Sequence, residues 1–142
     1  MAKRVLVLAI AACSRRAPIT SCEDDLRGVY RDGSEPWMVL DHGTTLEAYP
    51  LFPDVPPGGE AGLEVAPRVI DLARGAGPPS GTLHRRYLRG GESCDAHIPV
   101  HVTSCAGDLV ALVLADPAPP LGFAPCRWPG PGPSRVVRWR RE

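Results

Sequence analysis

The chain has 142 residues with 16 Lys or Arg and 16 Asp or Glu, so its formal net charge at pH 7 is zero. A neutral chain of this length has no overall attraction to nucleic acid, and it is long enough for one domain with a single core. Hydrophobic residues make up 44%, which excludes a wholly disordered chain, whereas 17 Pro and 15 Gly predict many turns and few long helices.

The chain has two positively charged residues near its start, followed by a short apolar run. Lys3 and Arg4 precede uncharged, small or branched residues over 5–12, and the run ends at Cys13. This order is typical of a secretory signal peptide. The alternative is a first buried parallel strand, but no Gly-rich turn or helical period follows it. The run is too short to span a bilayer as a helix, which takes about 20 residues.

The residues Ile10-Ala-Ala-Cys13 resemble the lipobox of bacterial lipoproteins, which reads aliphatic-small-small-Cys. The resemblance implies a signal peptide over 1–12 and a lipid on Cys13. It also implies a lipidated tether over 13–21 and leaves 22–142 as a single β domain. In this family Asp after the lipidated Cys retains the protein at the inner membrane. The Ser that follows Cys13 therefore implies the outer membrane, with the protein facing the periplasm.

Five cysteines also fit an exported protein. If Cys13 is lipidated, four remain, and four can form two disulfides in an oxidising compartment. Four cysteines allow three pairings. We favour Cys94 with Cys105, which would close a short local loop, and Cys22 with Cys126, which would tie the N-terminal segment to a late loop.

Alternating apolar residues and turn signals predict about eight short strands and at most one short helix. The segment 68–74 suits either a helix or a strand, and we favour a strand because its partner beyond the next loop is strand-like. The other predicted strands are 26–31, 37–40, 45–49, 82–89, 100–105, 109–115 and 135–140. The fold class is therefore mostly β, either a small antiparallel barrel or a sandwich. The basic run over 135–141 is interpreted as a last strand with solvated arginines, and no nucleic-acid partner is expected.

A long Pro/Gly-rich loop over 50–62 carries the apolar residues Leu51, Phe52 and Val55. Long loops without regular structure in a compact domain are often functional. The alternative is a plain excursion of the chain at the surface.

Residues on the first and last predicted strands resemble the lipocalin or calycin superfamily. In that superfamily a Gly-x-Trp on the first strand packs near an Arg on the last. Here the matching positions are Gly28 and Tyr30, and the last strand offers Arg138 or Arg140 beside Trp139. Tyr30 stands where Trp is usual. The resemblance implies an eight-stranded barrel that binds a small apolar or amphipathic ligand.

Aromatic side chains would line such a cavity if they point into the barrel. The candidate binding residues are Tyr30, Trp37, Tyr49, Phe52 and Tyr87. Core packing is the alternative role for these residues.

The cluster Cys94, His97, His101 and Cys105 could suggest zinc. Pro99 and β-branched neighbours oppose the helical turn that would bring the two histidines together. On a strand, four residues span about 13 Å, too far to share one ion. We therefore expect disulfides here and no metal.

Asp41 and His42 lie in a predicted turn, and no Gly-x-Ser-x-Gly nucleophile motif accompanies them. The acidic run 23–25 lacks the spacing of a calcium loop. No Gly-x-Gly-x-x-Gly or P-loop motif is present. We therefore expect a protein that is not an enzyme and uses no cofactor.

These patterns favour a lipid-anchored envelope protein whose expected partners are the membrane and either a small apolar ligand or an envelope protein. The leading hypothesis is ligand binding in a calycin-like barrel. The alternative is a protein-interaction or envelope-structural lipoprotein with a filled core, including a periplasmic inhibitor-like role. A ligand binder needs an apolar cavity of a few hundred Å³. An interaction protein needs a filled core and an exposed apolar patch.

Overall fold

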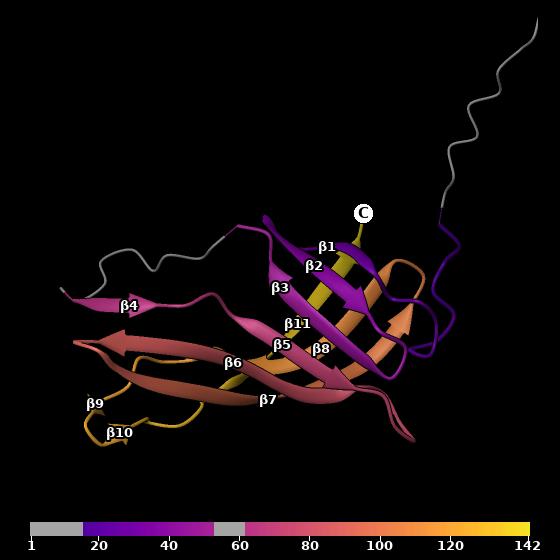
Figure 1. Ribbon diagram of the computed structural model, residues 1–142. Helices are drawn as coiled ribbons and strands as arrows, with labels where there is room; N and C mark the ends of the chain where they lie inside the picture. The colour runs from indigo at the N-terminus through magenta and orange to yellow at the C-terminus, as the bar shows by residue number, and fades with distance from the viewer. Residues whose placement is uncertain (1–15, 53–61) are drawn as a thin grey trace, which may run out of the picture.

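The computed structural model describes residues 16–52 and 62–142, which form a closed antiparallel barrel of eight strands without a helix (Figure 1). The fold class predicted from the sequence is confirmed, and of its two alternatives the barrel is correct. The barrel strands are β1 (Gly28–Asp32), β2 (Glu35–Asp41), β3 (Thr45–Pro50), β5 (Val69–Ala73), β6 (Ser80–Arg89), β7 (Glu92–Ala106), β8 (Leu109–Ala115) and β11 (Ser134–Arg141).

Each barrel strand pairs with its neighbours in sequence, and β11 pairs with β1 to close the barrel. This is an up-and-down barrel, an architecture that lipocalins share. Three short strands stand outside the cycle. Strand β4 (Leu63–Val65) extends the sheet along the end of β6, while β9 (Gly122–Phe123) and β10 (Cys126–Arg127) form a separate hairpin.

Strand β5 forms where the sequence favoured a strand over a helix, and β8 is a strand with the predicted bounds. Strand β7 begins eight residues before the predicted start at residue 100 and includes Pro99. Proline cannot donate a ladder hydrogen bond and is confined to strand edges. Pro99 is tolerated because the pairing of β7 with β8 begins only at His101, so at Pro99 the only ladder is with β6.

The core lies inside the barrel, where alternate residues of each strand point inward. Tyr30, Trp37 and Trp139 gather from β1, β2 and β11. The ring centroid of Trp139 lies 5.3 Å from that of Trp37 and 6.2 Å from that of Tyr30. Leu112 and Ile70 are fully buried on β8 and β5. Aromatic rings of this size fill a small barrel, as an eight-stranded interior permits.

The barrel has two different ends (Figure 1). We call one the N-terminal end, because the segment 16–27 lies there with the turns at 42–44, 74–79 and 107–108. We call the other the hairpin end, because the β6–β7 turn, β4 and the β9–β10 hairpin lie there.

Candidate functional site

The interior of the barrel is almost completely filled by side chains. The apolar cavity among the described residues has a volume of about 20 Å³. It is lined by Leu26, Tyr30, Val39, Leu46, Ala48, Leu72, Val102, Val110 and Trp139. A space of this size is close to that of one water molecule, whereas ligand pockets measure about 300–1,000 Å³. The space that these described residues enclose therefore has no room for a ligand in this conformation.

The five candidate binding residues do not meet around one cavity. Tyr30, Trp37 and Tyr87 are buried inside the barrel, at 3% exposure or less. Tyr49 points to the outer face of β3, next to the inward-facing Ala48. Phe52 follows β3 and is 72% exposed. The first three side chains pack the core, and the last two belong to the surface.

Tyr30 is held by an arginine from the last strand, as in the lipocalin pattern, but the arginine is Arg141. Its guanidinium carbon lies 5.6 Å from the ring centroid of Tyr30, and its Nε donates to the Tyr30 hydroxyl at 3.1 Å. The predicted Arg138 and Arg140 are wrong for this role. Trp139 points inward, so its two neighbours point outward, and the register sets Tyr30 opposite Arg141.

Gly28, the other residue of that pattern, leaves space for a side chain from the N-terminal segment. A Cβ at this position would stand 2.4 Å from Nη1 of Arg16. The same nitrogen donates to the backbone carbonyl of Arg27 at 2.6 Å. Because Gly28 has no side chain, the N-terminal segment at Arg16 can pass close to β1.

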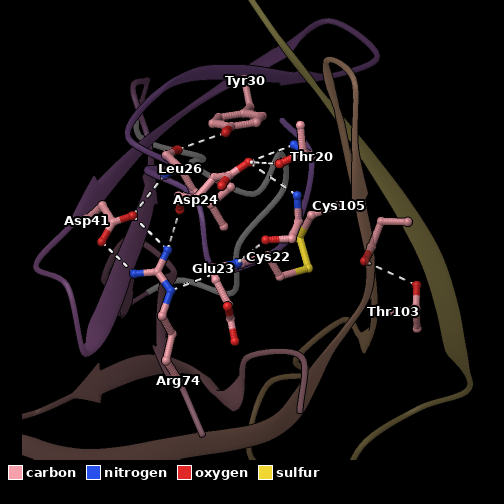
Figure 2. The surroundings of a disulfide bond; sticks show 12 residues. Thr20, Cys22, Glu23, Asp24, Leu26, Tyr30, Asp41, Arg74, Thr103 and Cys105 are labelled. Carbon is pink, nitrogen blue, oxygen red and sulfur yellow. Dashed lines mark hydrogen bonds and ion pairs between the residues drawn. A yellow bond between two sulfur atoms is a disulfide. The ribbon is translucent and has the colours of Figure 1, made fainter. Parts of the chain in front are cut away.

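All four predicted cysteines form disulfides, but the favoured pairing is wrong. One bond joins Cys22 to Cys105 (Figure 2), and the other joins Cys94 to Cys126. Cys94 and Cys105 lie eleven residues apart on β7, a distance of about 36 Å along an extended strand. Cysteines more than about 7 Å apart between Cα atoms cannot be bridged. The long β7, which the sequence did not reveal, excludes the favoured pairing.

The first disulfide anchors the segment 16–27 to the N-terminal end. Upstream of Cys22, the backbone N–H and C=O of Ile19 both bond to Gly107 at 2.8 Å. Asp24 accepts hydrogen bonds from the backbone and hydroxyl of Thr20, which fixes the turn between them (Figure 2). Ile19 belongs to the predicted tether, yet it is 4% exposed and joins the core.

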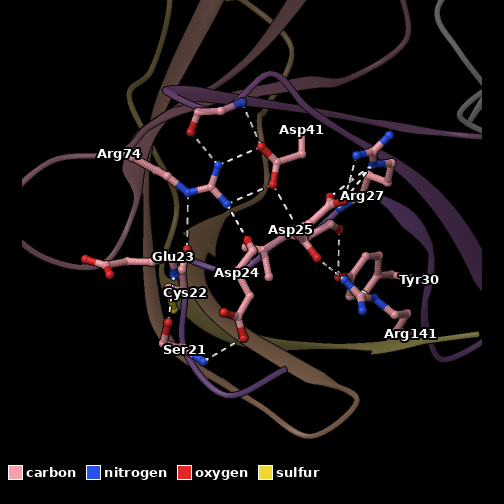
Figure 3. A network of polar contacts seen from close by, with 12 residues as sticks. Ser21, Cys22, Glu23, Asp24, Asp25, Arg27, Tyr30, Asp41, Arg74 and Arg141 are labelled. Carbon is pink, nitrogen blue, oxygen red and sulfur yellow. Dashed lines mark hydrogen bonds and ion pairs between the residues drawn. The ribbon is translucent and has the colours of Figure 1, made fainter. Parts of the chain in front are cut away.

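An ion pair at the N-terminal end completes this attachment, and Figure 3 shows its contacts. Arg74, just after β5, contacts both carboxylate oxygens of Asp41 at 2.6 and 2.8 Å. It also donates to the carbonyls of Cys22, Asp24 and Gly43 at 3.2, 2.7 and 2.6 Å. We call Arg74, Asp41 and their backbone partners the clamp.

The clamp is internally satisfied, so it is a structural site. The five donations of Arg74 have protein acceptors, and Asp41 also accepts from the backbone N–H of Leu26 and Gly43. These bonds, chiefly those from Arg74, hold the pKa of Asp41 well below its ordinary value, although burial opposes the shift. Since Asp41 is fully engaged, it does not form a dyad with His42.

The cysteine and histidine cluster does not converge on a metal ion. Cys94 and Cys105 are buried in disulfides, whereas His97 and His101 lie on the opposite, exposed face of β7. His97 instead stacks on His84 of β6, with ring centroids 6.2 Å apart. Within residues 16–52 and 62–142, no group of three or more His, Cys, Asp or Glu could hold a metal ion.

The outer wall of the barrel carries a row of apolar side chains. Val29 of β1 lies opposite Met38 of β2, and Met38 lies opposite Tyr49 of β3. Val69 follows on β5, one step beyond the Ala48–Ile70 pair. The four side chains of this outer apolar row alternate with buried ones and are partly exposed.

Two residues extend the outer apolar row beyond β3. The N–H of Leu51 donates to the carbonyl of Pro36 at 2.9 Å, which continues the β2–β3 ladder. Leu51 is 38% exposed and Phe52 is 72% exposed. The rest of the predicted loop, 53–61, including Val55, lies outside the described residues. Neighbouring exposed apolar side chains of this kind are typical of interaction surfaces.

Sequence reasoning found Tyr49, Leu51 and Phe52 because they are aromatic or lie in a conspicuous loop. It missed Arg74 and Met38. Period-two alternation on β2 and β3 was the signal available for Met38, because it sorts the outward positions from the inward ones. No local signal marks Arg74, since its partners come from segments more than thirty residues away in the chain.

No family model, curated protein or solved structure matches this chain. Over the part of the chain that the structure describes, no helix is long and apolar enough to cross a membrane.

Proposed function

We propose that this protein is an exported, lipid-anchored and non-catalytic envelope protein that acts by binding another protein through the outer wall of a filled barrel. The observation that carries the proposal is the contrast between the two faces of the sheet. The inside holds a cavity of about 20 Å³, whereas the outside presents the outer apolar row together with Leu51 and Phe52.

Two features support export. Two disulfides in one small domain are typical of oxidising compartments such as the periplasm. The signal peptide and the lipid on Cys13 fall outside the described residues and rest on the lipobox resemblance. The outer membrane facing the periplasm is the location this resemblance favours.

Ligand binding inside the barrel is the second candidate. The up-and-down topology and the packing of Arg141 on Tyr30 favour it, because lipocalins share both kinds of feature. It would require the barrel to open by several hundred Å³. The surface function requires no such change, and we therefore prefer it.

Photo-crosslinking in the host envelope tests the surface function. A photoreactive residue replaces Phe52 in one variant and Val136 in another. Val136 is a matched control because it is apolar, 51% exposed and lies in the part of β11 that pairs with β8 and has no partner on β1. We expect a discrete protein adduct from position 52 and none from position 136.

The double variant Met38→Ser, Tyr49→Ser should then reduce the adduct from position 52 at least about five-fold, because the removed apolar area contributes to binding. Val136→Ser should leave the yield unchanged. Equal adducts from both positions, or an adduct insensitive to the double variant, would contradict a role for the outer apolar row.

A further inference from the structure

The N-terminal segment is attached to the barrel only a few residues after the predicted lipid site. Ile19 is held by two backbone hydrogen bonds to Gly107, and Cys22 by its disulfide. Six residue steps separate Cys13 from Ile19. A fully extended chain spans at most about 3.5 Å per residue, so the two residues can be no more than about 21 Å apart.

The attachment does not depend on one bond. The clamp holds the carbonyls of Cys22 and Asp24, and Asp41 accepts from the N–H of Leu26. Leu26 is 2% exposed, and its carbonyl accepts a hydrogen bond from the Tyr30 hydroxyl. Residues 19–26 are thus part of the domain.

The barrel is long compared with this tether. Strand β7 has 15 residues and extends from the hairpin end to the N-terminal end over about 48 Å of strand, or about 35–40 Å along the axis at the usual tilt of barrel strands. To place the hairpin end against the lipid and the N-terminal end away from it, the tether would have to span the barrel. A reach of about 21 Å does not allow this.

We infer that the protein stands on the membrane with its N-terminal end toward the lipid and its hairpin end pointing away. This inference rests on the anchor of the proposed function. The surface that meets the lipid consists of the segment 16–27 and the turns at 42–44, 74–79 and 107–108.

The charges of this surface suit a close approach to a bilayer. Arg74 pairs with Asp41, and Arg140 pairs with Asp108 at 2.9 Å. The turn at 42–44 and residues 75–79 contain no Asp, Glu, Lys or Arg. The surface as a whole is nearly balanced, because segment 16–27 and the turns together carry Arg16, Arg27 and Arg74 against Glu23, Asp24, Asp25 and Asp108. Repulsion from an anionic headgroup layer is therefore weak. The outer apolar row, on the side wall, remains accessible to a protein partner.

Energy transfer from the protein to labelled lipid tests the orientation. The full chain is expressed with a fluorescent residue at Thr44, in the N-terminal end, or at Glu92, beside the β6–β7 turn. The lipidated protein is extracted and reconstituted in phosphatidylcholine vesicles that contain acceptor-labelled lipid. We expect transfer from position 44 to exceed transfer from position 92 at least about two-fold, because transfer falls steeply over the separation set by the barrel.

A longer tether is the matched control. Insertion of about 20 Gly and Ser residues between Ser14 and Arg15 leaves the clamp and both disulfides intact. A flexible insertion of this length extends the average reach by about 25 Å, so the two transfer values should converge.

Two different results would overturn the inference in distinguishable ways. An intact mass that lacks a lipid on Cys13 would remove the anchor, and with it both the proposed location and the orientation. A lipidated chain with equal transfer from positions 44 and 92 would leave the anchor and show that the barrel lies flat or tumbles, which overturns the orientation alone.

Discussion

At the scale of single residues, the clamp between Arg74 and Asp41 is a largely buried ion pair that joins distant segments. Both side chains are largely buried, at 16% and 6% exposure, and they join β2 to the turn after β5 and to the N-terminal segment. Removing one partner from a buried pair leaves the other charge uncompensated, which is costly. Exposed pairs such as Arg86–Asp95 lack this penalty.

Asp41→Asn should therefore destabilise the fold by about 3 kcal/mol, whereas Asp95→Asn should cost less than about 1 kcal/mol. Urea unfolding at pH 7 measures both. Equal losses in the two variants would show that the clamp contributes no more than a surface pair.

The same carboxylate predicts how stability depends on pH. The folded-state pKa of Asp41 is lowered, chiefly by Arg74, so the unfolded chain takes up its proton first as the pH falls. The stability that Asp41 contributes is complete above its ordinary pKa of about 3.8 and is lost as the pH falls below it. Between pH 5 and 3 the Asp41→Asn variant should lose less stability than the parent chain. A variant with the parent slope would contradict this assignment.

Gly81 is the glycine of the barrel that tolerates substitution least. A Cβ there would stand 1.9 Å from the carbonyl oxygen of Asp71, a backbone atom that cannot move aside cheaply. Gly77 has no atom within 4 Å of such a Cβ and no positive φ. Gly81→Ala should lower stability by about 2 kcal/mol or more, and Gly77→Ala should change it by less than about 1 kcal/mol. Thermal unfolding of the two variants compares them directly.

At the scale of elements, the two disulfides bind different parts of the molecule. Cys22–Cys105 ties the N-terminal segment to β7 and spans 83 residues, whereas Cys94–Cys126 ties the β9–β10 hairpin to β7 and spans 32. Arg89 packs over Phe123 of that hairpin at 5.1 Å. The first bond secures the N-terminal end, and the second secures a local extension of the hairpin end.

Replacing both cysteines of a pair by Ser should cost about 4.6 kcal/mol for Cys22 with Cys105 and about 3.7 kcal/mol for Cys94 with Cys126, since a longer closed loop restricts the unfolded chain more. Denaturant unfolding of the two double variants gives the order. The reverse order would show that native contacts near the hairpin outweigh chain entropy.

At the scale of the whole molecule, the filled barrel leads to a prediction about the mass of the native protein and what is bound to it. Protein extracted gently from host membranes should begin at Cys13 with its lipid and gain about four mass units on reduction, two for each disulfide. Its native mass spectrum should contain no stoichiometric small molecule. A bound apolar molecule that survives extraction would favour the ligand-binding alternative and require a conformation with an open interior.

The sequence by itself determined the strand-rich class, the approximate positions of seven of the eight barrel strands, and the participation of four cysteines in disulfides. These features are local: alternation, turn residues and the count of cysteines act within a few residues or do not depend on position. It also picked out Tyr30 near an arginine of the last strand, although the arginine proved to be Arg141.

Only the tertiary structure decided which residues meet across the barrel. The cysteine pairing depends on how far β7 extends, and the clamp joins Arg74 to residues up to 52 positions away. Whether Tyr30 and Trp37 line a cavity or fill the core depends on the volume that the closed sheet encloses. Closure, register and enclosed volume arise from the pairing of distant strands, and no local pattern in the chain encodes them.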